Sequence, residues 1–186
     1  MKIGFLTGAR SEYGVMRQLI QRVSEDSFFI PVIYVTGMHF QRKYGLTINE
    51  LKADNFAPIV EMPCYTEEQR DKKDDFVALI DAIYAGLSSN RPDILYLIGD
   101  RLEAYAGALA AHFLGITIAH FAGGQITKGA LDNIYRYNIS NLSTVHFVTN
   151  KYAYDRLKQI PIIENKTIHL LSLIHISEPT RRSWIS

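Results

Sequence analysis

The sequence has very little cysteine and no excess of either charge. Its single cysteine, Cys64, can form neither an internal disulfide nor a thiolate metal cluster, and we expect it to be a small buried hydrophobic residue. The 20 Lys and Arg residues are balanced by 19 Asp and Glu residues, for a net charge of +1. Because nucleic acids and anionic membranes are bound by clustered Lys and Arg, we expect neither as a partner.

Long hydrophobic runs are also absent. No apolar run approaches the roughly 20 residues needed to cross a bilayer, and the run at 3–6 is far shorter than that of a signal peptide. We therefore expect a cytoplasmic protein. The hydrophobic content of 47% indicates one globular domain.

Apolar runs of strand length alternate with segments in which apolar residues recur every three or four positions. This alternation is typical of a parallel sheet covered by helices. We expect strands at 3–6, 30–35, 57–62, 94–98, 116–121 and 145–148, and helices at 12–25, 48–53, 74–87, 102–113, 133–142 and 151–157. The sequence therefore predicts an α/β fold with a doubly wound, mainly parallel, Rossmann-like sheet of about six strands.

The last residues break this pattern. The segment 171–181 matches the in-frame translation of a transposase sequencing adapter. We therefore expect a Rossmann-like domain at 1–170, a non-native tail at 171–186 and a natural reading frame that was cut near Leu170. The alternative is a genuine amphipathic C-terminal segment.

The first strand is followed by a loop that can bind an anion. Thr7-Gly8-Ala9-Arg10-Ser11 offers backbone N–H groups and a guanidinium at the start of a helix. The loop is neither Gly-x-Gly-x-x-Gly nor a P-loop, and no acidic residue follows the second strand at Thr36–His39, which argues against NAD. The alternative is a plain turn in which Ser11 is the N-cap of the helix.

The fourth strand ends in a carboxylate and a guanidinium. Asp100 can act as an acid or base, and Arg101 can pair with a phosphate or carboxylate. Ligands of open α/β sheets bind at the carboxyl ends of the strands, so both residues belong to one candidate crevice. Asp100 followed by Glu103 is equally a capping-box pattern.

The fifth strand leads into a long glycine-rich loop. Gly123, Gly124 and Gly129 allow a ligand to come close to the backbone, and Asp132 and Arg136 lie one helical turn apart. Asp132 can instead cap the helix and pair with Arg136. Of the histidines on the strands, His120 is interpreted first as a satisfied core residue and second as a base, and His146 fits an outward position.

Five of these segments together resemble the hydrolysing UDP-N-acetylglucosamine 2-epimerases of sialic-acid and related sugar pathways. In chain order they are Thr7 to Gly14, Val35 to His39, Gly99 to Glu103, Ala119 to Gln125 and Asp132 to Arg136. The similarity covers roughly residues 1 to 170, and no single motif would be specific.

This resemblance implies the first half of a GT-B-like two-domain fold, with substrate between two Rossmann-like halves. Family members eliminate UDP from UDP-N-acetylglucosamine through a 2-acetamidoglucal and then add water, giving N-acetylmannosamine. The catalytic carboxylates implied by the resemblance are Asp100 and Asp132; the implied substrate-binding residues are Arg10 and Arg101 near the phosphates, with Arg136, His39, Gly124 and Gln125. The resemblance implies no cofactor and no metal. It implies a homo-oligomeric parent, and we expect the chain by itself to be inactive.

The sequence departs from the family pattern at the glycine-rich loop. Ala122 and Gln125 stand in a region where members commonly carry a carboxylate, Asn133 stands for a second Asp, and Tyr137 for a His. Gln125 can hydrogen-bond a sugar but cannot take a proton. Two alternatives therefore stay open, a non-catalytic nucleotide-sugar-binding module and an epimerase acting on a modified UDP-N-acetyl sugar. A GT-B glycosyltransferase donor half is disfavoured by the motif set.

Overall fold

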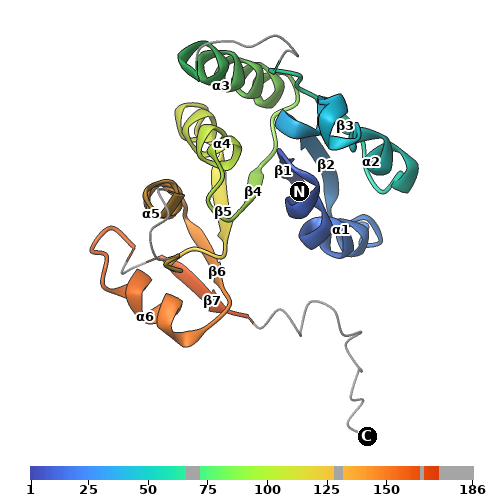
Figure 1. The fold of residues 1–186 in the computed structure, drawn as a ribbon. Helices are drawn as coiled ribbons and strands as arrows, with labels where there is room; N and C mark the ends of the chain where they lie inside the picture. The colour runs from blue at the N-terminus through green and yellow to red at the C-terminus, as the bar shows by residue number, and fades with distance from the viewer. Residues whose placement is uncertain (66–71, 128–131, 164–165, 172–186) are drawn as a thin grey trace, which may run out of the picture.

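The computed structural model describes residues 1–65, 72–127, 132–163 and 166–171. Strands and helices alternate along the chain (Figure 1). The strands are β1 (Lys2–Thr7), β2 (Ile30–Val35), β3 (Ile59–Glu61), β4 (Ile94–Ile98), β5 (Thr117–Phe121), β6 (Val145–Val148) and β7 (Thr167–Leu170). The helices are α1 (Arg10–Ser24), α2 (Ile48–Asp54), α3 (Lys72–Ser89), α4 (Leu102–Phe113), α5 (Asp132–Leu142) and α6 (Lys151–Lys158), with short 3₁₀ turns η1 (Gly37–Phe40) and η2 (Arg42–Tyr44).

The strands form one parallel sheet in the order β3-β2-β1-β4-β5-β6-β7. The order reverses between β1 and β4, so the chain leaves these two neighbouring strands toward opposite sides. Such a switch point opens a crevice at the carboxyl ends of the strands. The predicted doubly wound, Rossmann-like fold is therefore confirmed.

Two hydrophobic cores cover the two faces of the sheet. Neighbouring residues of a strand point to opposite faces: Phe5 packs in the core that includes α1 and α2, and Leu6 in the core that includes α3, α4 and α5. Figure 1 shows these helix groups on opposite sides of the sheet. Five buried alanines (Ala104, Ala106, Ala108, Ala110 and Ala111) let α4 lie close to its neighbours.

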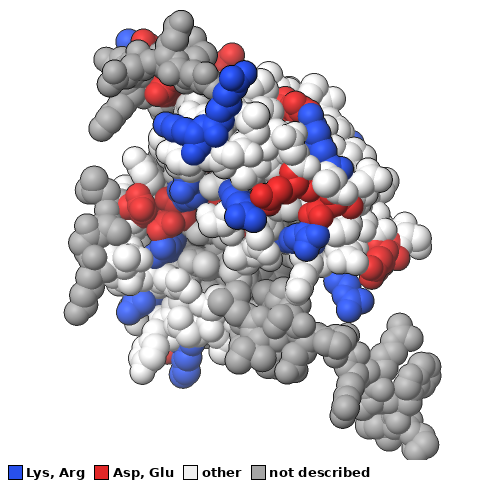
Figure 2. All heavy atoms as spheres, turned by 45° about the vertical axis from the view of Figure 1, so that its right-hand side comes forward, with Lys and Arg blue, Asp and Glu red and all other residues white. Residues whose placement is uncertain are grey.

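The surface agrees with the even charge balance. On the face in Figure 2, acidic and basic side chains are interspersed over the region of α1 and α2. None of the helices in the described ranges is long and apolar enough to cross a membrane.

The structure corrects three expectations about the elements. The sheet includes a further strand, β7, which pairs with β6 over Thr167–Leu170 and was missed because it is short and adjoins the tail set aside above. Helix α1 begins at Arg10 with Ala9 as its N-cap, so Ser11 is not the cap. His146 is fully buried rather than outward. The proposed tail, apart from Leu171, lies outside the described residues.

Candidate functional site

Asp100 and Arg136 form an ion pair at the carboxyl edge of the sheet. Asp100 follows β4 directly, and Arg136 lies on the second turn of α5; its Nη2 donates to Asp100 Oδ2. The Asp100 side chain is 22% exposed and that of Arg136 is 8% exposed. Helix α4 has Arg101 as N-cap without a side-chain cap, so the capping interpretation of Asp100 is wrong.

Burial raises the pKa of Asp100 above its ordinary value. The adjacent Arg136 guanidinium acts against this rise, because it favours the charged form, while the carboxylate of Asp132 adds to it. A raised pKa makes a carboxylate a stronger base than an ordinary one, and Asp100 keeps contact with solvent.

Arg136 ties Asp100 to the glycine-rich loop. Its Nη1 donates to the Gln125 carbonyl at 3.0 Å and to Asn133 Oδ1 at 3.4 Å. It therefore does not form the surface pair with Asp132 weighed above, and Asp132 at the start of α5 is exposed. The Gln125 side-chain amide donates to Thr149 Oγ1 at 2.5 Å.

Gly124 holds the same loop against α6. Its φ of +72° lies in the left-handed region, and an added Cβ would collide with the Ala153 carbonyl oxygen. Its own carbonyl accepts from Arg156 Nη1 at 3.1 Å. A glycine at position 124 therefore lets the glycine-rich loop pack against α6.

The loop after β1 is closed by the protein's own side chains. Glu12 Oε2 accepts the N–H groups of Gly8 and Ala9 at 2.7 and 3.1 Å, so the backbone anion site expected there is already occupied by a carboxylate. The Glu12 side chain is buried, and burial together with the nearby Glu103 carboxylate raises its pKa to about 7.

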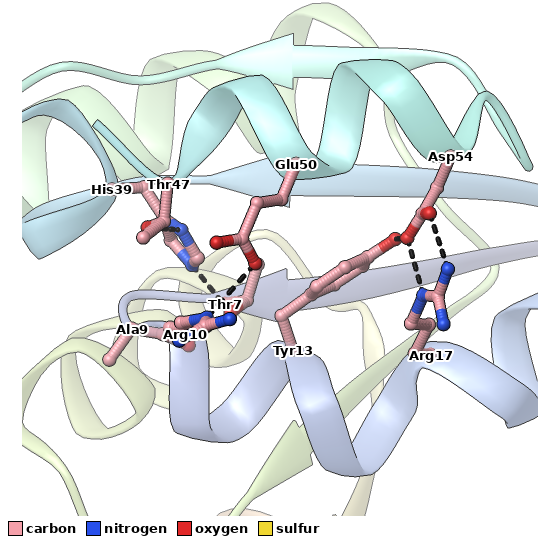
Figure 3. A network of polar contacts seen from close by, with 9 residues as sticks. All are labelled: Thr7, Ala9, Arg10, Tyr13, Arg17, His39, Thr47, Glu50 and Asp54. Carbon is pink, nitrogen blue, oxygen red and sulfur yellow. Dashed lines mark hydrogen bonds and ion pairs between the residues drawn. The ribbon is translucent and has the colours of Figure 1, made fainter. Parts of the chain in front are cut away.

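Arg10 and His39 belong to the network in Figure 3. Arg10 Nε lies 3.0 Å from Glu50 Oε2 on α2, and both side chains are exposed. His39 is fully buried between Thr7 Oγ1 at 2.9 Å and Thr47 Oγ1 at 2.7 Å, and burial lowers its pKa to about 4. Both ring nitrogens are therefore engaged, and the imidazole joins the end of β1 to the segment before α2.

A cleft of about 410 Å³ opens beside these loops at the carboxyl ends of the strands. It is lined by Met38, Gln41, Lys43, Tyr44, Tyr65, Asp75, Arg101, Leu102, Glu103, Asp132 and Tyr135. The Arg101 side chain, one-third exposed, lies against Glu103 and Met38. Of the predicted site residues, Arg101 and Asp132 line this cleft, while Arg10 borders a separate hollow between α1 and α2.

Sequence reasoning missed the aromatic and basic side chains of the cleft and the burial of Glu103. Tyr44 and Tyr65 lie in the segments that follow β2 and β3. Because ligands of such sheets bind at the carboxyl ends of the strands, this position could have identified both residues from the sequence. Tyr135 stacks on Tyr105 of α4 with ring centroids 5.3 Å apart.

His120 is a satisfied core histidine, as expected. Its Nε2 donates to the Gly99 carbonyl at 2.7 Å, and its Nδ1 lies 3.0 Å from Ser140 Oγ. Complete burial lowers its pKa to about 3, so the ring is neutral and carries its proton on Nε2. The imidazole links the residue before Asp100 to α5, which carries Arg136.

The similarity to known proteins extends over most of the chain. The Legionella pneumophila UDP-N,N'-diacetylbacillosamine 2-epimerase (hydrolyzing) is 36% identical over 160 residues, which are 84% of this chain and 42% of that protein. The Neisseria meningitidis UDP-N-acetylglucosamine 2-epimerase is 29% identical over 170 residues, 89% of this chain and 43% of that protein. The crystal structure of UDP-GlcNAc 2-epimerase from Neisseria meningitidis bound to UDP-GlcNAc superposes with a TM-score of 0.77 at 19% identity, over 91% of this chain and 45% of that one.

The chain thus spans less than half the length of these relatives, as expected for the first half of a GT-B-like fold. The family model for UDP-N-acetylglucosamine 2-epimerase matches residues 21–171. This match covers most of the sheet and four of the five motifs in full. The chain belongs to the UDP-N-acetylglucosamine 2-epimerase family.

Proposed function

We propose that this chain is the N-terminal part of a hydrolysing epimerase that converts UDP-N-acetylglucosamine to N-acetylmannosamine and UDP. The observation that carries the proposal is the half-buried Asp100–Arg136 pair at the end of β4, with Asp132 close enough to raise the pKa of Asp100. Family membership supplies the reaction type.

The proposed chemistry has two steps. In the first, a carboxylate removes the proton from C2 of the sugar, the bond between C1 and the UDP oxygen breaks, and a 2-acetamidoglucal forms. In the second, water adds its oxygen to C1, and a proton returns to C2 on the opposite face. Both steps need a positioned acid and base, which we assign to Asp100 and Asp132.

Expulsion of a diphosphate also needs cations near its developing charge. We assign this role to Arg101, whose guanidinium borders the cleft, and to Arg10, whose exposed guanidinium contacts Glu50 in a surface ion pair that a phosphate can replace. Arg136 orients Asp100. Gln125, Gly124 and His39 shape the surrounding loops.

The rest of the cleft and of the uridine pocket is proposed to come from a second domain, because the relatives are more than twice as long as the matched region. We expect the 186-residue chain to be inactive by itself and the full-length parent to be a homo-oligomer.

The test is to express the full-length gene product and incubate it with UDP-N-acetylglucosamine. Release of UDP and N-acetylmannosamine in equal amounts is the expected result. Binding without turnover would instead support the non-catalytic module, and no binding would refute the assignment.

A modified sugar is the second candidate substrate. The similarity to the Legionella pneumophila enzyme, named for UDP-N,N'-diacetylbacillosamine, favours it, and so does Gln125, which stands where a carboxylate is common. Assaying both UDP-sugars in parallel decides between the substrates. Gln125→Glu then tests whether the glycine-rich loop lacks a catalytic carboxylate. Increased turnover would support this, and unchanged turnover would count against it.

A further inference from the structure

The cleft beside β1, β2 and β4 contains a buried carboxylate that the proposed chemistry does not use. We propose that Glu103 accepts a hydrogen bond from the sugar ring of the substrate, from a hydroxyl or an acetamido N–H, so that this cleft is the sugar subsite. The inference rests on the proposed function and deepens it by naming how the sugar is recognised.

Glu103 has too few donors for a buried carboxylate. It is 4% exposed, and an ionised carboxylate offers about four acceptor positions. Within the described ranges, its hydrogen-bond donor is Arg101 Nη2, at 3.5 Å from Oε1; Arg101 Nε lies 3.3 Å from Oε2 as an ion-pair contact without a hydrogen bond. These separations exceed the 2.7–2.9 Å of a strong charge-assisted bond, so acceptor capacity is left for a ligand.

Two other carboxylates, Asp54 and Glu12, accept several short hydrogen bonds from the protein's own donors. Asp54 accepts from Tyr13 Oη, Arg17 Nε and Arg17 Nη2, each at 2.6 Å, as Figure 3 shows. Glu12 accepts two backbone N–H groups. Glu103 has neither arrangement, and it alone of these three lines the cleft.

The surrounding loops make room for the Glu103 side chain. A Cβ added at Gly8 would lie 2.6 Å from Glu103 Cγ, and one added at Gly37 would lie 2.9 Å from its Oε1. Both distances are too short for any other residue to be accommodated without movement. Three strand exits, those of β1, β2 and β4, therefore converge on this one carboxylate.

The local charge favours a neutral donor over an anion. The Arg101 guanidinium is already paired with the Glu103 carboxylate, and Glu12 lies close enough to both to interact with them electrostatically. A phosphate placed beside Glu103 would be repelled by its carboxylate, so we assign the diphosphate to the partly exposed guanidinium of Arg101 instead. A sugar brings hydroxyl and amide donors without charge, and Tyr44, Tyr65 and Tyr135 line the same cleft with ring surface.

The experiment compares a ligand that has the sugar with one that lacks it. In the full-length protein, made non-turning by Asp100→Asn, calorimetry measures the Kd of UDP-N-acetylglucosamine and of UDP with and without Glu103→Gln. We expect the Kd of UDP-N-acetylglucosamine to rise at least about tenfold, because a hydrogen bond to a charged group is lost, while the Kd of UDP changes less than about twofold.

Two results would overturn the inference. An equal loss for both ligands would mean that Glu103 acts on the nucleotide side through Arg101, and no loss for either would make it a structural carboxylate. Failure of the Asp100→Asn parent to bind UDP-N-acetylglucosamine, while wild type also lacks turnover, would instead refute the proposed function itself.

Two further variants separate folding from recognition. Asp155→Asn removes a lysine-paired carboxylate of α6 that lines neither the cleft nor the hollow at Arg10, and it should leave both affinities unchanged. Glu103→Asp keeps the charge but withdraws the carboxylate by one methylene, and we expect the same selective loss. If Glu103→Gln does not fold, Glu103→Asp decides the question by the same criterion.

Discussion

The two sides of the switch point use polar residues in opposite ways. On the β1 side, Glu12 occupies the backbone N–H groups of its loop, Arg10 pairs with Glu50, and His39 is engaged at both ring nitrogens. On the β4 side, Asp100 keeps contact with solvent, and Arg101 lines an open cleft. We therefore expect the acid–base chemistry on the β4 side, where Arg101 lines the cleft, whereas on the β1 side the exposed Arg10–Glu50 pair is the one that a ligand can open.

The largest effect is expected from Asp100→Asn in the full-length protein. Removing a general base costs about 10²–10⁴-fold in rate, and the substitution keeps the shape of the side chain beside Arg136. We expect turnover of UDP-N-acetylglucosamine to fall by that factor with little change in Tm. A large drop in Tm with turnover retained would mean that Asp100 is a structural residue. The β4 side of the switch point would then differ from the β1 side in no catalytic respect.

Arg136→Gln should produce the next largest effect, on the pH profile of kcat/KM. Arg136 acts to lower the pKa of Asp100, so its removal raises that pKa further. A base works in its ionised form, so the acid limb of the profile should move to higher pH. The loss of kcat/KM should therefore be larger at the acidic end of the profile than at pH 8.

The matched control for this variant is Arg17→Gln, which breaks the arginine–carboxylate pair with Asp54 outside the cleft. It should leave the profile in place. A profile that is the same for wild type and Arg136→Gln would show that Asp100 is not the titrating base.

Arg10→Ala tests whether the β1 side is closed to substrate. If the exposed guanidinium leaves Glu50 for a phosphate, KM for the UDP-sugar should rise about fivefold to tenfold, since a charge-assisted hydrogen bond is lost. Glu50→Gln, which frees Arg10 without removing it, should not raise KM. Unchanged kinetics for Arg10→Ala would take Arg10 out of the site.

Glu12→Gln should have its effect on stability rather than on rate. The pKa of Glu12 is about 7 in the folded chain against an ordinary value of 4.5, so the folded state binds this proton more tightly than the unfolded state. The contribution of Glu12 to the free energy of unfolding is therefore complete below pH 4.5. It falls as the pH rises to about 7, by roughly 3 kcal/mol at most.

The measurement is the difference in Tm between wild type and Glu12→Gln from pH 4.5 to 8. The difference removes the opposite contribution of the buried histidines, whose lowered pKa values make stability rise with pH between about 4 and 6.5. A difference that does not vary with pH would show that folding does not raise the pKa of Glu12.

Much of the fold followed from local pattern. The strand at Ile94–Ile98 and the helix at Leu102–Phe113 were predicted with their observed bounds, because periodicity and strand-length apolar runs are local signals. The strand Thr167–Leu170 was not, since a four-residue edge strand carries little pattern. The predicted site residues stay predictions for function, but the structure shows which of them meet: Asp100 with Arg136, and Arg101 with Asp132 at one cleft.

The sequence by itself determined the alternating α/β order, the polar strand exits and the family motifs, because each depends on residues close together in the chain. Only the tertiary structure decided what each exit does. Arg136 reaches Asp100 across 36 positions, Arg10 reaches Glu50 across 40, and Glu103 is buried against the Gly8 and Gly37 loops. How the strands pair and the helices pack decides which of these distant residues meet. Burial in that packed arrangement, and not the neighbouring sequence, then shifts their pKa values.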